Sequence, residues 1–167
     1  MKRIAKFEKI SQKQFNIDWN DNKEKNTDKI YESIKVPKRA TSGSAGYDFY
    51  ALNEVLLAPG ESIKMATGVR VKIDEGWVLK IYPRSGLGFK YRLQLANTVG
   101  IIDSDYYYSD NEGHIFIKIT NDSREGKALL IEVGDAFAQG VFVEYGITVD
   151  DDATGIRNGG FGSTDKQ

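Results

Sequence analysis

The sequence contains no cysteine and only one histidine, His114. The absence of cysteine excludes a thiolate nucleophile, a disulfide framework, an iron–sulfur cluster and a Cys-ligated zinc ion. A single histidine argues against a His-based triad or a multi-His metal site, and we expect it on a strand face near a turn. Carboxylates, hydroxyls, amides, Lys, Arg and any cation that a substrate carries remain. This set suits the chemistry of phosphate groups.

An excess of charge of one sign and a long apolar run are missing as well. The 167 residues hold 23 Lys+Arg and 24 Asp+Glu, a formal net charge of -1, so no overall field would hold nucleic acid. No apolar run approaches the roughly 20 residues that span a bilayer, and residues 1–8 lack the hydrophobic block of a signal peptide. We therefore expect a soluble, cytoplasmic protein that binds neither nucleic acid nor membranes.

Short β-branched and aromatic segments, separated by Gly, Asn, Asp and Pro, fill the chain from about residue 34 to residue 146. This pattern predicts one all-β domain, a sandwich or barrel, and no part of it sustains a long helical period. The clearest predicted strands are residues 62–65, 69–73, 77–82, 114–119 and 137–145.

Both ends of the chain differ from this pattern. Residues 3–9 predict an added strand, residues 11–16 a short capped helix, and residues 18–28 a polar, mobile linker. Residues 150–155 separate the last strand from a glycine-rich tail at 157–165 that cannot hold a fixed shape by itself. We therefore divide the chain into an N-terminal extension of unknown role (1–30), a β-barrel domain (31–149) and a flexible C-terminal arm (150–167).

The most informative segment is residues 97–106 (NTVGIIDSDY). Val99, Ile101 and Ile102 predict a buried strand, and the glycine between them marks a close approach of another group. Asp103 follows where the strand emerges, with a second aspartate on the same side of an extended chain. A carboxylate held there can order and partly deprotonate a water molecule. A polar hairpin turn is an equally good interpretation of this segment alone.

Residues 83–88 (PRSGLG) are a candidate phosphate-binding turn. The glycines permit backbone N–H groups to point at an anion, Arg84 supplies a charged fork, and Ser85 supplies a hydroxyl. The segment is neither a P-loop nor a dinucleotide fingerprint, and an ordinary Gly-rich turn is the competing interpretation.

Two polar residues within strands are further candidates. Asp48 caps a turn or pairs with Arg84 and holds its guanidinium in place. Gln139 lies in an apolar strand, where an unpaired amide would be costly, so we expect a partner such as a phosphate oxygen.

Five segments, in this order, resemble the motifs of the homotrimeric all-β dUTPase family. They are residues 45–51 (AGYDFYA), 83–88 (PRSGLG), 100–106 (GIIDSDY), 134–139 (GDAFAQ) and 157–164 (RNGGFGST). Five ordered matches are far more specific than any single short pattern. The resemblance implies a distorted jelly-roll or β-barrel with a flexible C-terminal arm, which hydrolyses dUTP to dUMP and pyrophosphate. Such an enzyme removes dUTP from the nucleotide pool and supplies dUMP for dTMP synthesis.

By this resemblance, Asp103 activates the water that attacks the α-phosphorus, and Gln139 and Asp48 complete the catalytic set. A hairpin at residues 97–102 reads uracil mainly through backbone groups, and its close fit excludes a 5-methyl group and cytosine. Tyr106 packs under the deoxyribose and leaves no room for a 2′-hydroxyl. The hairpin residues assigned to substrate binding are Asn97, Gly100 and Ile102.

The triphosphate contacts also follow from the resemblance. The α- and β-phosphates are assigned to Arg84, Ser85, Gly86 and Gln139. The γ-phosphate and the cover over uracil are assigned to arm residues Arg157, Phe161, Gly162, Ser163 and Thr164. Mg²⁺ would arrive on the triphosphate with few or no direct protein ligands. The family's sites lie between subunits, which implies a homotrimer, here in the cytoplasm of a bacterial or phage-infected bacterial cell.

Three features depart from the family pattern. Residues 107–113 (YYSDNEG) are longer than the usual tight turn, so this loop is expected to protrude and is a candidate contact for a regulatory protein. Arg157 lies one residue closer to Phe161 than in the commonest pattern, which weakens its γ-phosphate assignment. Ala136 and Gly140 replace bulkier residues.

Two other functions compete. A dCTP deaminase of the same fold would use a glutamate after the equivalent strand, but no glutamate follows Asp103 before Glu112, and Tyr106 fits the dUTPase pattern. A protein-binding module, gated by nucleotide, is the second alternative, motivated by the long loop at 107–113 and by the 30 N-terminal residues.

Overall fold

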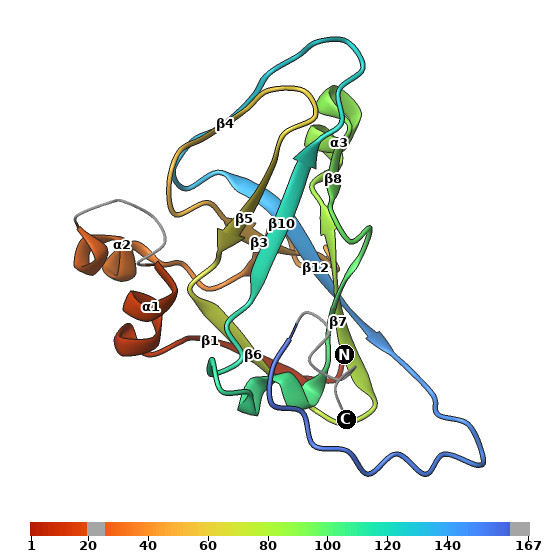
Figure 1. The fold of residues 1–167 in the computed structure, drawn as a ribbon. Coiled ribbons are helices and arrows are strands. Elements are labelled where there is room, and N and C mark those ends of the chain that lie inside the picture. Colours follow the sequence, from red (N-terminus) through yellow and green to blue (C-terminus); the bar gives the residue numbers. More distant parts are fainter. Residues whose placement is uncertain (20–25, 161–167) are drawn as a thin grey trace.

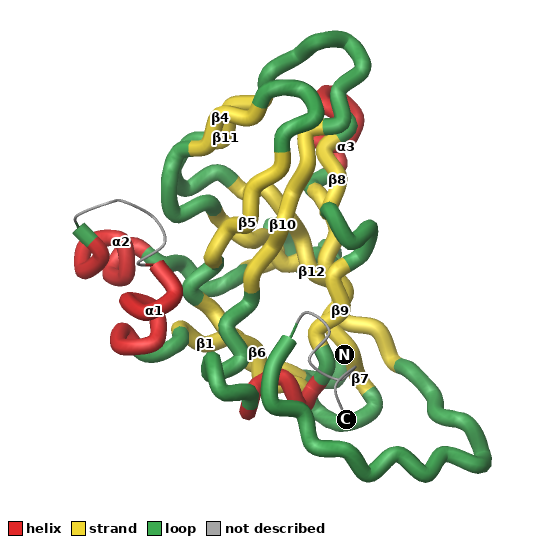
Figure 2. Tube along the Cα trace, in the orientation of Figure 1, coloured by secondary structure: helices red, strands yellow, loops and turns green. Residues whose placement is uncertain are grey.

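Antiparallel strands form most of the regular secondary structure in the computed structural model, which describes residues 1–19 and 26–160. In chain order the elements are β1 (Ala5–Lys9), α1 (Gln12–Trp19), α2 (Thr27–Ser33), β2 (Lys38–Arg39), β3 (Tyr47–Tyr50), β4 (Val55–Leu57), β5 (Ser62–Ala66), β6 (Val69–Ile73), β7 (Trp77–Pro83), α3 (Ser85–Tyr91), β8 (Leu93–Leu95), β9 (Gly100–Ile102), the 3-10 helix η1 (Ser104–Tyr108), β10 (Phe116–Asn121), β11 (Leu129–Ile131) and β12 (Ala136–Glu144). In Figure 1, α1 and α2 lie together beside β1, and α3 lies at the far end of the molecule. Figure 2 shows that strands occupy the centre. The all-β prediction is confirmed.

The largest sheet has the strand order β2-β3-β12-β7-β9. Its long central strand β12 pairs with β3 on one side and with β7 on the other, both antiparallel. Leu79 and Ile81 on β7 are buried, as a period of two requires for a strand with one face toward the core. The short strand β9 is the sheet's edge, and its residues pair with the middle of β7.

A second sheet, β5-β10-β8, packs its alternate residues into the same core. The five clearest strand predictions correspond to β5, β6, β7, β10 and β12, with β10 beginning two residues later than expected. The chain turns tightly between β8 and β9, where the Thr98 N–H donates to the Leu95 carbonyl at 2.9 Å. These two strands pair with different neighbours, β10 and β7, so the expected hairpin at 97–102 bridges two sheets.

The buried strand predicted at 99–102 is partly wrong. Only Gly100–Ile102 form a strand, and Ile101 is 51% exposed because β9 is an edge strand whose middle side chain points outward. Asp103 and Asp105 were expected on one side of an extended chain. Instead, the 3-10 helix η1 begins at Ser104, directly after Asp103.

The turn predicted at 83–88 is also corrected. Helix α3 begins at Ser85, and Gly86 and Gly88 lie inside it with negative φ, so neither glycine serves an unusual backbone conformation. The helix is seven residues long, too short to produce a clear periodic pattern in the sequence. Arg84 precedes the helix with extended backbone angles.

The N-terminal segment is part of the core. β1 pairs with β6, and Ser11 caps α1 by accepting the Gln14 N–H at 3.1 Å, which confirms the predicted strand and capped helix. The mobile linker predicted at 18–28 is wrong at both ends: α1 continues to Trp19, which is 1% exposed and stacks on Phe15, and α2 begins at Thr27. Residues 20–25 lie outside the described part. Within the described ranges, no helix has the length and hydropathy to cross a bilayer.

Candidate active site

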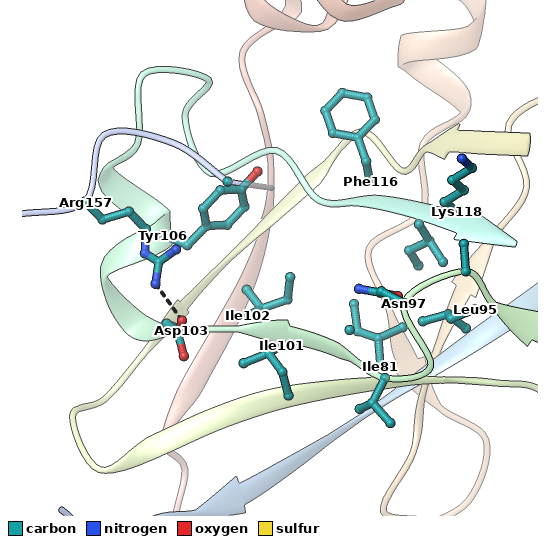
Figure 3. A pocket seen from close by; sticks show the side chains of 15 residues that line it. Ile81, Leu95, Asn97, Ile101, Ile102, Asp103, Tyr106, Phe116, Lys118 and Arg157 are labelled. Atoms are coloured by element: carbon teal, nitrogen blue, oxygen red, sulfur yellow. Dashed lines mark hydrogen bonds and ion pairs between the residues drawn. The ribbon is translucent and has the colours of Figure 1, made fainter. Parts of the chain in front are cut away.

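A cavity of about 430 Å³ opens beside β9, β10 and η1 (Figure 3). Six of the site residues predicted from sequence line it: Asn97, Gly100, Ile102, Asp103, Tyr106 and Arg157. In Figure 3, Asp103, Tyr106 and Arg157 lie at one end, and Asn97 lies at the other. The cavity therefore combines a polar, charged end with a largely apolar body.

The sequence did not identify the other walls of this cavity. They come from β7, β8 and β10 and include Ile81, Leu95, Phe116 and Lys118. Strand alternation indicated that β7 and β10 carry inward residues, but it could not show which of them face a cavity and which face the core. That distinction depends on how the two sheets diverge, and the sequence carries no local signal for it.

Tyr106 is held rigidly in the cavity wall. Its hydroxyl donates to the His114 carbonyl at 2.7 Å and accepts the Asn111 side-chain amide at 2.9 Å. Only 6% of the residue is exposed, and burial raises the pKa of its phenol above the ordinary value. Gly160 lies against the ring, where a Cβ atom would approach it to 3.0 Å. A ring fixed on three sides is suited to act as a platform for a ligand.

Arg157 bridges the two aspartates at the charged end. Its Nη2 lies 2.7 Å from Asp103 Oδ2, and its Nε lies 2.8 Å from Asp105 Oδ1 (Figure 3 draws the first contact). The Asp103 and Asp105 side chains are 42% and 53% exposed. Pairs exposed to this degree contribute only about 0–1 kcal/mol each, so Arg157 can leave them for a stronger anion.

A second polar group gathers where β7 ends. Arg84 forms an ion pair with Asp48, and the Gln139 amide donates to the Pro83 carbonyl at 3.2 Å. Sheet register places Gln139 directly opposite Asp48. The structure thus supplies the partners that the sequence led us to expect for Asp48 and Gln139, although Gln139 contacts a carbonyl rather than an anion.

Ser85 and Gly86 lie beside this group as the first two residues of α3. The first N–H groups of a helix have no partner within it, so both amides are available. Gly46 leaves room for the Gln139 side chain, because a Cβ atom at position 46 would come within 2.7 Å of Gln139 Oε1. A side chain at position 46 would therefore displace the glutamine.

Asp103 and this second group lie near opposite ends of β7. Leu79 on β7 pairs with Ile102, the last residue of β9, so Asp103 lies beside Val78. Arg84 comes six residues after Val78 in the chain. At about 3.3 Å per residue the separation is roughly 20 Å. This backbone separation exceeds the length of a triphosphate.

The remaining predicted contacts lie beyond the described residues. They are Phe161, Gly162, Ser163 and Thr164, and their assignments stay predictions. Among residues 1–19 and 26–160, no three or more His, Asp or Glu side chains cluster so as to hold a metal ion.

The loop at 107–113 does not protrude as expected. Tyr107 donates to Glu8 Oε2 at 2.7 Å, and Glu112 accepts the Ser11 hydroxyl at 2.6 Å. The N-terminal segment therefore covers most of this loop, and Tyr108, which is 72% exposed, is the main side chain left facing outward.

Comparisons with known proteins agree with this geometry. The dUTPase family model matches residues 32–165. A deoxyuridine 5'-triphosphate nucleotidohydrolase of Lactococcus lactis is 43% identical over 134 residues, covering 78% of this chain and 88% of the relative. The solved structure of a dUTPase from Streptococcus mutans has a TM-score of 0.64 at 32% identity, covering 87% of this chain and 98% of that one.

A dUTPase from phage phi11 of S. aureus, for which a structural Mg(II) ion is described, has a TM-score of 0.65 at 23% identity and covers 90% of this chain and 97% of that one. This last likeness concerns the fold. The family model spans the segments from AGYD to the arm, and the resemblance to the dUTPase family is confirmed together with the jelly-roll-like fold. The chain belongs to the dUTPase family.

Proposed function

We infer that the protein is a dUTP diphosphatase, which hydrolyses dUTP to dUMP and pyrophosphate and so removes dUTP from the nucleotide pool. The observation that carries this function is the cavity with Asp103 at its charged end and the fixed ring of Tyr106 in its wall. A nucleoside in the cavity would direct its 5′-phosphates toward Asp103. The cytoplasm, where nucleotides are made, is the proposed place of action.

Asp103 is the proposed general base. When Arg157 leaves it for the substrate's phosphates, its carboxylate is free to accept a proton from a water molecule. The water oxygen attacks the α-phosphorus, the bond to the bridging oxygen breaks, and pyrophosphate leaves. Mg²⁺ would arrive with the substrate's triphosphate and would offset its negative charge.

Nucleoside recognition is assigned to the turn before β9. Asn97 and the backbone around Gly100 line the end of the cavity away from Asp103, in reach of a base edge. Buried apolar walls around such a base would reject an added methyl group by overpacking, while unpaired backbone groups would reject cytosine. Tyr106 is the proposed platform for deoxyribose.

The phosphate-binding group must come from another copy of the chain. Arg84, supported by Asp48, and the amides of Ser85 and Gly86 form an anion-binding group that lies roughly 20 Å from Asp103 of the same chain. A homotrimer with sites shared between subunits would bring the two groups together. The arm, residues 150–167, would then close on the γ-phosphate through Arg157.

The test is direct. The purified protein with Mg²⁺ is given dUTP, dCTP, dTTP or UTP, and pyrophosphate and the nucleotide product are measured. We expect pyrophosphate and dUMP from dUTP and little turnover of the other three. Deamination of dCTP would instead identify the related deaminase activity. A regulatory protein partner at residues 107–113 stays a prediction.

A further inference from the structure

Behind Tyr106, the N-terminal segment meets the end of the loop that follows it. His114 is fully buried, and its Nδ1 lies 2.6 Å from Asp18 Oδ2 at the end of α1. On its other side, the backbone N–H of Gly68 points at His114 Nε2, 2.9 Å away. The imidazole is therefore clamped between α1 and the β5–β6 turn.

These two contacts determine where the imidazole proton lies. The Gly68 N–H can only donate, so Nε2 must carry the lone pair and the proton must be on Nδ1. Nδ1 then donates to Asp18, whose carboxylate also accepts the Gln14 amide at 3.1 Å. Burial alone would raise the pKa of Asp18, but these hydrogen bonds outweigh it and lower the pKa below its ordinary value.

The histidine transmits its position to Tyr106 through its own backbone. The His114 carbonyl accepts the Tyr106 hydroxyl at 2.7 Å, so a shift of His114 moves the hydroxyl end of the ring. Gly113, with φ of 72°, closes the loop tightly, and a Cβ there would lie 2.7 Å from the Tyr106 carbonyl. The clamped imidazole and the Tyr106 ring therefore have little freedom to move relative to each other.

We propose that Asp18 and His114 form a positioning pair that sets the Tyr106 ring for deoxyribose, so that the N-terminal extension takes part in discriminating dUTP from UTP. The inference rests on the proposed function, which assigns Tyr106 to the sugar. It gives a role to a segment, residues 1–31, that lies outside the matched dUTPase region. Asp18 is not one of the residues that line the cavity; it holds His114 by a hydrogen bond, and its negative charge also raises the pKa of the Tyr106 phenol.

The test compares Asp18→Ala with Gln12→Ala. Gln12 lies on the same helix, and within the described residues its side chain donates to Asp28 of α2, so its loss loosens the segment without removing a contact to His114. For Asp18→Ala we expect KM for dUTP to rise on the order of tenfold, the cost of one hydrogen bond to a charged partner, with kcat much less affected. The ratio of kcat/KM for UTP to that for dUTP should also rise. Gln12→Ala should retain wild-type values.

A conservative variant separates positioning from general stability. Asp18→Asn keeps an oxygen that accepts from Nδ1 and should recover most of the wild-type KM and sugar discrimination. If Asp18→Ala does not fold, Asp18→Glu tests the proposal instead. Its longer side chain keeps the charge but displaces His114, so we expect KM for dUTP to rise.

Three results would contradict the proposed role of the Asp18–His114 pair. They are wild-type KM and sugar discrimination in a folded Asp18→Ala, wild-type values in Asp18→Glu, or a rise in KM and a loss of discrimination in Gln12→Ala equal to those in Asp18→Ala. An inactive wild-type protein would instead count against the proposed function itself. Because the pair is judged only by ratios to an active wild type, the two failures are distinguishable.

Discussion

Asp103 is the proposed general base, and among the carboxylates of the described residues it alone lines the cavity, with Asp105 beside it through Arg157. Asp103→Asn removes the proton acceptor while keeping the shape. We expect kcat for dUTP to fall roughly 10²- to 10⁴-fold, the usual contribution of a general base, with KM little changed. Steady-state pyrophosphate release measures both constants.

Asp105→Asn is the matched control for that prediction. Asp105 shares Arg157 with Asp103 but does not line the cavity, and its side chain is 53% exposed. We expect its loss to change kcat by less than about threefold, since exposed ion pairs contribute little. A fall in kcat as large as that of Asp103→Asn would mean that the base has been assigned to the wrong aspartate.

The substitution Gly46→Ala tests the phosphate-binding group by adding a single methyl group beside Gln139. The added methyl of Gly46→Ala would come within 2.7 Å of Gln139 Oε1, so the glutamine must move away from Asp48 and Pro83. We expect KM for dUTP to rise several-fold, with a loss of stability of about 1 kcal/mol because a flexible side chain yields. Gly43→Ala is the control, since nothing lies within 4 Å of that position. Equal KM values in both variants would contradict the assignment.

At the scale of elements, residue type alone predicted the strands well. The run that became β6 alternates apolar and polar residues, as a strand with one buried face does, and the run that became β7 is rich in aromatic and β-branched residues. Pairing of Asp48 with Arg84 was one of two interpretations of the sequence, and only the family resemblance grouped Gln139 with them; the cost of an unpaired amide predicted a partner for Gln139 without identifying it. The 20 Å between that group and Asp103 was not foreseen, because it follows from the pairing of β7 with β9.

Helix α1 shows why other elements were missed. Its last residues, Asp18 and Trp19, begin a strongly polar run that reads as a linker. They are ordered by partners far along the chain, His114 for Asp18 and the core for Trp19. Contacts between residues 96 positions apart leave no local signal, so tertiary packing overrides composition here.

The attachment of α1 to His114 should depend on pH. The pKa of Asp18 is lowered below its ordinary value of 3.8, because hydrogen bonds from His114 and Gln14 outweigh burial. The ionised carboxylate therefore adds stability that is complete well above that value and is lost as the pH falls through the lowered pKa. Wild type should unfold at a higher temperature than Asp18→Asn at pH 7, and thermal unfolding should show this difference shrinking below about pH 4. A difference that stays constant with pH would contradict the prediction.

At the scale of the whole molecule, β7 sets the arrangement of the site. It carries the cavity wall at Ile81 and ends at Arg84, while Asp103 leaves the sheet near its beginning. In the proposed homotrimer, the two groups of one chain would serve different nucleotides, and neighbouring copies would align opposite ends of their β7 strands, an arrangement that closed symmetry can provide.

This arrangement predicts complementation between two inactive variants. Asp103→Asn lacks the base, and Arg84→Ala lacks the phosphate fork, so homotrimers of either should be nearly inactive. After mild unfolding and refolding together, some sites combine Asp103 from one variant with Arg84 from the other. For equal amounts we expect recovered activity of roughly a quarter of wild type, because independent filling of two positions gives one intact combination in four.

Refolding each variant alone is the control, and light scattering before and after mixing reports the oligomeric state. If both groups of a site came from one chain, no mixture would contain an intact site, and activity would stay at the level of the separate variants. Recovered activity therefore requires a site built from two chains. If mixed trimers form but recover no activity, Asp103 and Arg84 of one chain must serve the same site despite the roughly 20 Å between them along β7.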